Sequence, residues 1–216
     1  MRNMTLLTAL AIATIGAGCS SLDRSRDLSD PRVSGKTLAQ QVCSICHGLD
    51  GNSISPKFPR LAGQQKQYLE NQLKDFRARH RADPPGPEYM WGIARSLTDE
   101  QIAGLADYFS MQTPKPNTPA PPAVVAEGRR LYENGLPEKE TPPCAACHGP
   151  DAQGRGGFPR LAGQYEYYLL RQLHVFQETE LRPGTPMKQI THALTPQEME
   201  TLASYLQGLR SGAASD

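Results

Sequence analysis

Apolar residues recur at intervals of three and four positions in three segments of the chain, and similar segments recur in the same order in its second half. Such spacing is typical of helices that bury one face. In the first half it predicts helices that begin at Ser34 or Gly35, that run over about residues 64–79, and that follow Thr98. Their apolar faces consist of Leu38, Ala39 and Val42; of Tyr68, Leu69, Leu73 and Phe76; and of Ile102, Leu105, Ala106 and Phe109. The pattern predicts an all-α protein.

The second half repeats these helices with small gaps, which indicates an internal duplication. The counterparts are expected over residues 124–134, around Tyr168 to Phe176, and after Thr195. Each final helix is preceded by a capping box, Thr98 to Gln101 in the first copy and Thr195 to Glu198 in the second, and this motif fixes a helix start. We therefore expect two tandem helical domains of similar structure.

Glycines stand near the start of the first helix of each copy, at Gly35 and Gly128. One interpretation is that the first helix crosses the last one there, near Tyr108 and Tyr205, where a side chain would keep the two backbones apart. The other is that both are simple helix-start glycines.

An uncharged, mostly apolar run extends from Met4 to Gly18 after one positive charge at Arg2. It is shorter than the roughly 20 residues that span a bilayer, so it predicts an export signal and a periplasmic protein. Cys19 follows small residues and precedes a polar tail, which favours an acylated lipoprotein cysteine that tethers the chain to a membrane. The alternative is ordinary cleavage near Ala17, which leaves Cys19 as a free thiol.

Proline marks the boundary between the copies, with five prolines in residues 113–122. Such a segment predicts an extended and fairly stiff connector. The expected organisation is a signal peptide at 1–18, an N-terminal tether at 19–33, a first domain at 34–112, the Pro-rich linker at 113–122, a second domain at 123–210 and a tail at 211–216.

Charge changes this picture little, because 23 basic residues are balanced by 22 acidic ones. This balance gives no indication of nucleic-acid binding. A local contrast exists between the basic run from Arg77 to Arg81 and the acidic pair Glu178 and Glu180. We expect these side chains to be solvated ends of surface helices, and the alternative is that they orient a docking partner.

The strongest chemical signal is a Cys-x-x-Cys-His motif in each copy, with each motif followed later by Phe-Pro-Arg-Leu-Ala-Gly-Gln. Two thiols one helical turn apart can add to the two vinyl groups of a porphyrin, and the next histidine can reach the iron. The motifs comprise Cys43, Cys46 and His47, and Cys144, Cys147 and His148. They predict two covalently bound haem c groups, without which the small domains would be largely unfolded. A redox dithiol and half of a zinc site are the alternatives.

A second iron ligand should come from the later half of each domain. Met90 and Met187 are expected in Pro-containing loops before the final helices, which can fold back over the haem, and a thioether raises the potential of a haem, which suits an electron carrier. Core methionines are the alternative for both. The competing nitrogen ligands are His80, His174 and His192, each of which we expect at the surface.

The repeated heptapeptide offers groups that would support the haem. The carbonyls of Pro59 and Pro159 are expected to accept from the imidazole nitrogen that does not face the iron. Candidates for binding the haem propionates are Arg60, Arg160, Gln64, Gln164, Tyr68 and Tyr168. The alternative for these residues is ordinary surface packing.

Over about residues 34–210 the chain resembles the cytochrome c4 family of two-haem cytochromes c. The resemblance rests on the duplicated Cys-x-x-Cys-His, the repeated Pro-Arg-Leu-Ala-Gly-Gln, and a Met segment that leads to Leu-Thr and a last helix. It implies two class I cytochrome c folds related by an approximate twofold axis, with the haem edges facing each other through their propionates. The insert at residues 135–143 and the lipoprotein-like Cys19 depart from the family pattern.

The resemblance also implies one-electron transfer in the periplasm between donor and acceptor complexes, toward a haem-copper terminal oxidase. With both axial positions filled, such a protein is a carrier and not an enzyme. One alternative is the electron-transfer subunit of a specific dehydrogenase, such as the cytochrome partner of a flavoprotein sulfide dehydrogenase. Another is a two-haem enzyme, such as a peroxidase or a thiosulfate dehydrogenase, which would need an open or unusual distal ligand.

Overall fold

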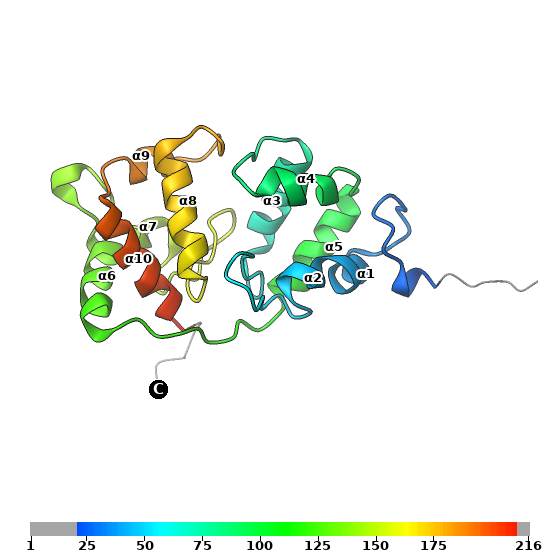
Figure 1. Ribbon diagram of the computed structural model, residues 1–216, viewed down its shortest axis with the longest axis horizontal. Coiled ribbons are helices and arrows are strands. Elements are labelled where there is room, and N and C mark those ends of the chain that lie inside the picture. Colours follow the sequence, from blue (N-terminus) through cyan, green and yellow to red (C-terminus); the bar gives the residue numbers. More distant parts are fainter. Residues whose placement is uncertain (1–20, 211–216) are drawn as a thin grey trace, which may run out of the picture.

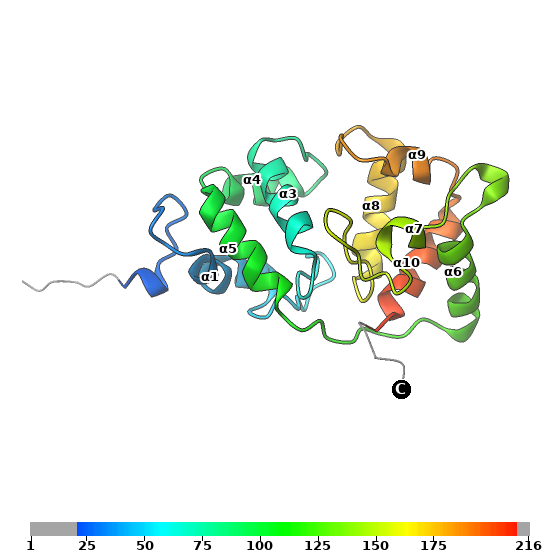
Figure 2. The same ribbon diagram turned by 180° about the vertical axis from the view of Figure 1, so that it is seen from behind.

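The two copies of the sequence form two helical domains that lie side by side in the computed structural model, which describes residues 21–210 (Figures 1 and 2). The first domain contains α1 (Gly35–Leu38), the π-helical turn η2 (Ala39–Cys43), α2 (Ser44–His47), α3 (Lys66–Arg77), α4 (Gly86–Ala94) and α5 (Asp99–Ser110). The second contains α6 (Pro122–Asn134), the short 3-10 turn η3 (Pro137–Lys139), α7 (Ala145–His148), α8 (Glu166–Glu178), α9 (Met187–Thr191) and α10 (Pro196–Gly208). Between residues 21 and 210 the regular elements are all helical, which confirms the all-α fold.

The starts of the final helices are confirmed. The side chain of Thr98, the residue before α5, accepts from the backbone N–H of Gln101. The side chain of Thr195, the residue before α10, accepts from that of Glu198. In each case a side-chain oxygen of the third helical residue accepts from the backbone N–H of the capping residue, so two exposed backbone donors are satisfied.

Each final helix packs against the first helix of its domain, and a glycine lies at each crossing. A Cβ atom on Gly128 of α6 would lie 2.3 Å from Cβ of Tyr205 on α10. On Gly35 of α1 it would lie 2.5 Å from the backbone nitrogen of Leu105 on α5. The close-contact interpretation is therefore correct, although the first crossing lies against Leu105 and not at Tyr108.

We expect Gly128→Ala to destabilise the protein by about 1–3 kcal/mol, because the added methyl group has no room and α6 must move away from α10. The matched control is Gly92→Ala in α4, where an added Cβ meets nothing within 4 Å. Chemical unfolding of both variants, followed by circular dichroism, measures the difference. Equal stabilities would contradict the assignment of a tight crossing.

The segment before the first domain belongs partly to that domain, which corrects the expected tether at 19–33. Val33 is fully buried and Leu28 packs against the first core. The Gln101 amide donates to the carbonyls of Asp30 and Val33, at 3.0 Å in both cases. The expected signal peptide, Cys19 and the tail at 211–216 lie outside the described residues.

The linker ends one residue before its expected end and is held by the first domain. Helix α6 already begins at Pro122, where proline is well tolerated because the first helical position has no backbone partner to lose. The side chain of Asn52 donates to the carbonyl of Thr113 and accepts from the backbone of Lys115. The connector therefore runs along the edge of both domains as a fixed strap (Figures 1 and 2).

The insert at residues 135–143 forms a small loop beside the start of α10. Leu136 and Thr141 form an isolated antiparallel bridge around η3. Lys139 at its tip pairs with Glu198 at 2.7 Å, and Glu198 is also the residue that completes the capping box of α10. The insert thus packs on its own domain. It separates the haem motif from α6 in sequence, but the two remain neighbours in space.

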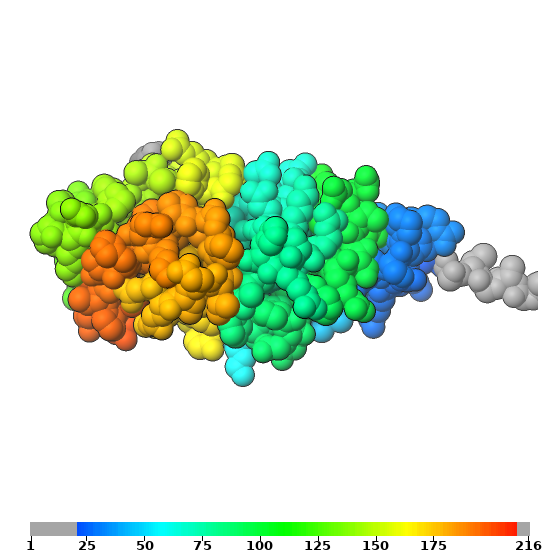
Figure 3. Space-filling model, turned by 90° about the horizontal axis from the view of Figure 1, so that it is seen from above, coloured from blue at the N-terminus to red at the C-terminus, as the bar shows by residue number. Residues whose placement is uncertain are grey.

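The facing surfaces of the two domains are in contact, as Figure 3 shows from above. The Gln64 side chain accepts from the backbone nitrogen of Arg160 at 2.6 Å and donates to its carbonyl at 2.9 Å. Gln164 makes the same two bonds with the backbone of Arg60, both at 2.9 Å. This exchange has the form of an approximate twofold relation. It uses each amide oxygen and one of the two hydrogens on each Nε2, so the hypothesis that these glutamines bind propionates stays a prediction.

Candidate haem sites

The Cys-x-x-Cys-His motifs make up α2 and α7, with Cys43 and Cys144 as the capping residues of these short helices, and both histidines are buried. Nδ1 of His47 lies 2.9 Å from the carbonyl oxygen of Pro59, and Nδ1 of His148 lies 2.9 Å from that of Pro159. Because a carbonyl only accepts, Nδ1 must carry the proton, which leaves the lone pair on Nε2. Burial lowers the pKa of both imidazoles, so the neutral form that can bind iron is favoured.

The two thiols that begin the motifs are unsuited to dithiol exchange. Burial raises the pKa of Cys43 to about 12 and that of Cys144 to about 11. A redox cysteine instead needs a lowered pKa, because the thiolate is the nucleophile. In the part of the chain that the structure describes, His, Cys, Asp and Glu side chains form no group of three or more that could hold a metal ion. These observations weigh against the dithiol and zinc alternatives.

One continuous cavity of about 610 Å³ is lined by both domains and contains both motifs. This is within the range of about 300–1,000 Å³ that is usual for cofactor sites. The iron-ligand candidates all line it: His47, Met90, His148 and Met187, together with the four motif cysteines. Apolar side chains from α3, α5, α8 and α10 make up much of its wall, which suits a porphyrin.

The two methionines reach the cavity from short helices. The sequence placed both in loops, which was wrong: Met90 lies within α4, and Met187 is the first residue of α9. Each helix follows a Pro-containing segment that leads back from α3 or α8, so the expected return of the chain over the cavity is present.

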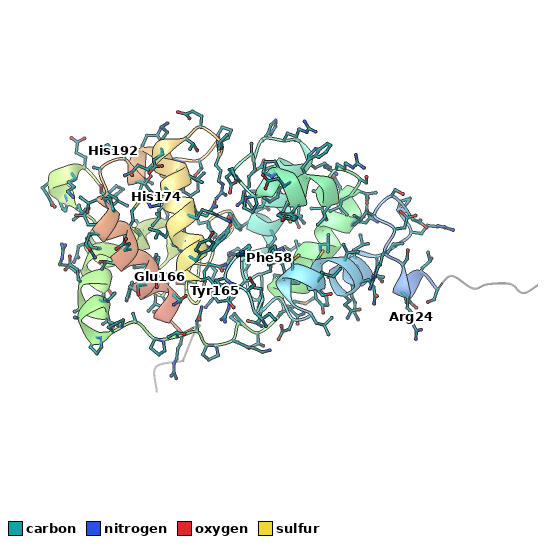
Figure 4. The ribbon with its side chains drawn as sticks, viewed as in Figure 1. Arg24, Phe58, Tyr165, Glu166, His174 and His192 are labelled. Atoms are coloured by element: carbon teal, nitrogen blue, oxygen red, sulfur yellow. The ribbon has the colours of Figure 1, made fainter. Side chains whose placement is uncertain are left out.

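The histidines that compete with these methionines are less well placed. Nδ1 of His174 lies 2.9 Å from the carboxylate of Glu178, and Nδ1 of His192 lies 2.6 Å from the carbonyl of Gln189. Figure 4 shows both histidines in the second domain, away from the boundary between the domains. His80 does line the cavity, but its side chain is exposed.

Two arginines that the sequence did not single out as functional line the cavity at the boundary between the domains. Arg81 was expected to be a solvated helix end, but it is only 8% exposed. Its guanidinium lies over the ring of Phe76, and that of Arg182 lies over Phe176. Arg81 donates to the hydroxyl of Tyr168 at 3.1 Å, and Arg182 lies 3.4 Å from that of Tyr68. Each arginine thus reaches across to the tyrosine of the other domain.

The arginines of the heptapeptide are placed differently. Arg60 lines the cavity, but one of its terminal nitrogens donates to the carbonyl of Lys115 and its guanidinium lies 4.7 Å from the ring centroid of Tyr165. Figure 4 shows Tyr165 near Phe58 at the domain boundary. Arg160 is not among the residues that line the cavity, and burial lowers its pKa.

Comparisons with known proteins agree with this geometry. The model of the cytochrome c family matches residues 33–112 and again residues 125–210. The solved structure of reduced recombinant cytochrome c4 from Pseudomonas stutzeri has a TM-score of 0.73 and 36% sequence identity, and the alignment covers 84% of this chain and 100% of that one. This chain belongs to the cytochrome c4 family.

Two curated relatives extend the comparison. Cytochrome c-552 of Acidithiobacillus ferridurans is 38% identical over 211 residues, which cover 96% of this chain and 89% of the relative. The thiosulfate dehydrogenase electron acceptor of Thiomonas intermedia is 35% identical over 207 residues, which cover 91% of this chain and 88% of the relative. As a cytochrome c4, this protein has two tandem cytochrome c domains and carries two covalently bound haem c groups.

Proposed function

We propose that this cytochrome c4 carries single electrons between membrane-bound complexes of the periplasm, toward a haem-copper terminal oxidase. In this proposal His47 and Met90 bind one iron, and His148 and Met187 bind the other. The observation that carries it is that one cavity receives a histidine and a methionine from each domain. Bound haem would supply the one-electron chemistry, and these four side chains would hold the two irons, so that no substrate has to bind the metal.

Around this group the side chains have distinct roles. The carbonyls of Pro59 and Pro159 fix the ring orientation of the proximal histidines and keep Nδ1 protonated. Tyr68 and Tyr168 lie with Arg182 and Arg81 where the domains meet, which suits groups that bind propionates between the haems. Arg60 and Arg160 remain proposed propionate ligands, and the contacts described above give them less support than the boundary arginines.

The carrier role is tested with the purified, reduced two-haem protein. Membranes that contain a haem-copper oxidase are expected to oxidise it rapidly in the presence of oxygen, and cyanide that blocks the oxidase should stop the reaction. Carbon monoxide should bind slowly to the isolated cytochrome, because a histidine and a methionine would already hold each iron. Fast carbon monoxide binding by the unmodified protein would contradict the carrier assignment and would favour a two-haem enzyme.

A second candidate is the role of electron acceptor for one dehydrogenase. It is favoured by the likeness to a protein described as a thiosulfate dehydrogenase electron acceptor, which extends over nearly the whole of both chains. In this case thiosulfate together with its dehydrogenase should reduce the oxidised cytochrome, whereas thiosulfate alone should not. A reaction with the dehydrogenase but not with oxidase membranes would replace the leading proposal with this one.

Attachment to the membrane is proposed through Cys19, which follows the export signal. Between residues 21 and 210, none of the helices has the length and hydrophobicity that crossing a membrane requires. We expect Cys19→Ser to release the protein from membranes, whereas the unmodified protein should resist a high-salt wash because two acyl chains give stable binding. Mass spectrometry that finds an unmodified N-terminal peptide in the native protein would disprove lipidation and leave the haem assignment intact.

A further inference from the structure

The boundary between the domains contains a buried polar cluster that is nearly symmetric. Both domains contribute the same four residue types in related positions: Tyr68, Gln72, Phe76 and Arg81 from the first, and Tyr168, Gln172, Phe176 and Arg182 from the second. Gln72 accepts from both arginines at 2.7 Å, and Gln172 also accepts from both. In this arrangement each arginine is held by glutamines of both domains.

One member of the cluster has no counterpart, and it carries a charge. Asp83 is only 1% exposed and follows Arg81 by two residues, whereas the residue two places after Arg182 is Gly184. Asp83 accepts from Nε of Arg81 at 2.7 Å and from the amide of Gln172 at 2.9 Å. Its distance to Nε of Arg182 is 4.0 Å, so it pairs mainly with the arginine of its own domain.

Asp83 is ionised in this setting. Burial alone would raise its pKa, but the guanidinium of Arg81 and the amide of Gln172 outweigh that effect and lower the pKa. The cluster therefore holds two positive charges and one negative charge away from solvent. The positive charge of Arg81 is largely compensated by Asp83, whereas that of Arg182 is compensated much less.

The cluster residues line the same cavity as the haem ligands, so this difference in charge compensation acts on both haem groups. A positive charge near a haem favours the ferrous form, which has one positive charge fewer than the ferric form, and a negative charge favours the ferric form. Since the other cluster members are paired by the approximate twofold relation, they affect the two haems alike. We propose that Asp83 lowers the potential of the haem in the first domain relative to that in the second and so sets the direction of electron transfer within the molecule.

The test is Asp83→Asn in the two-haem protein, which removes the charge and keeps the shape and most of the hydrogen-bonding capacity. The potential of the first haem is expected to rise by an amount equivalent to about a tenfold change in its reduction equilibrium, or about 59 mV for one electron. The second haem should shift less in the same direction. The two haems can be followed separately in a Cys46→Ala background, where one vinyl group stays conjugated and moves the absorption band of the first haem.

Two comparisons separate the charge from a merely structural effect. Glu88→Gln removes the same charge from an exposed position on α4, so its effect should be small and should vanish in high salt, whereas that of Asp83→Asn should persist. Loosening of the boundary would admit water and lower both potentials, because water stabilises the more highly charged ferric form. Asp83→Glu should keep the potentials near their original values.

The proposal is overturned if the first haem in Asp83→Asn keeps or lowers its potential, or if the second haem shifts more than the first. These outcomes do not depend on which protein donates or accepts the electrons. Failure of the oxidase or thiosulfate dehydrogenase assays would therefore leave the role of Asp83 standing, and its own failure would leave the carrier function standing.

Discussion

Protein that is produced without haem attachment is expected to be largely unfolded. The reason is the size of the cavity that the two domains share, about 610 Å³. Without the porphyrin, the apolar side chains that line this cavity stay in contact with water, and each such Leu or Phe loses roughly 1.5–3 kcal/mol of burial energy. For several side chains together this approaches the whole free energy of unfolding of a typical domain, about 5–15 kcal/mol. The side chains of these small domains therefore cannot stabilise the fold by themselves.

The experiment compares the two-haem protein with a chain in which Cys43, Cys46, Cys144 and Cys147 are replaced by Ala. Circular dichroism of the variant should show loss of most of the helical signal, and amide hydrogens of α5 and α10 should exchange rapidly. In the matched control only Cys144 and Cys147 are replaced by Ala. This change should unfold α8 to α10 and should destabilise the first domain less than the second. A haem-free chain with the helix content and cooperative unfolding of the native protein would contradict this expectation.

Features with a local cause were predictable from the sequence. The helices α5 and α10 begin where capping boxes place them, because the capping residue and the third helical residue are only three positions apart. The apolar face of each helix followed from the spacing of its residues. Gly35 and Gly128 were crossing points in one of the two interpretations of the sequence, and that interpretation placed the partner of Gly35 near Tyr108 and not at Leu105.

Features that arise between the domains were not predictable in this way. Gln64 and Gln164 stand in a repeated motif, which suggested a role toward the haem, but each binds the backbone of the other copy. Arg81 and Asp83 lie in a polar stretch that is typical of a solvated turn. They are buried because the second domain covers them, and no pattern within one copy records that contact.

The segment before α1 was misjudged for a related reason. Residues 21–30 are mostly polar, which is typical of a tether. The core contacts of this region depend on two apolar side chains, Leu28 and Val33, and on backbone carbonyls that Gln101 binds. Carbonyl groups are present at every residue, so their use by a distant side chain leaves no trace in the composition.

The second large effect is expected from loss of a methionine at the distal side of a haem. Met187→Ala should abolish the ferric iron-to-sulfur charge-transfer band of the second haem and lower its potential by on the order of 100 mV, a fraction of the roughly 0.8 V range that axial ligands span. The thioether favours ferrous iron, so water or a nitrogen ligand in its place stabilises the ferric form. Met90→Ala should do the same to the first haem alone.

The methionines of the chain supply matched controls. Met111 is 75% exposed after α5, and Met199 is fully buried in the core on α10, so neither can bind iron in this fold. Met111→Ala should change neither the spectrum nor the potentials, and Met199→Ala should lower stability by about 2–5 kcal/mol while both charge-transfer bands persist. An unchanged band in Met90→Ala or Met187→Ala would reject that residue as a ligand. Because Met187 begins α9 beside a cavity that also receives His148, its loss would open the second iron and make it bind carbon monoxide rapidly, whereas the first haem would stay closed.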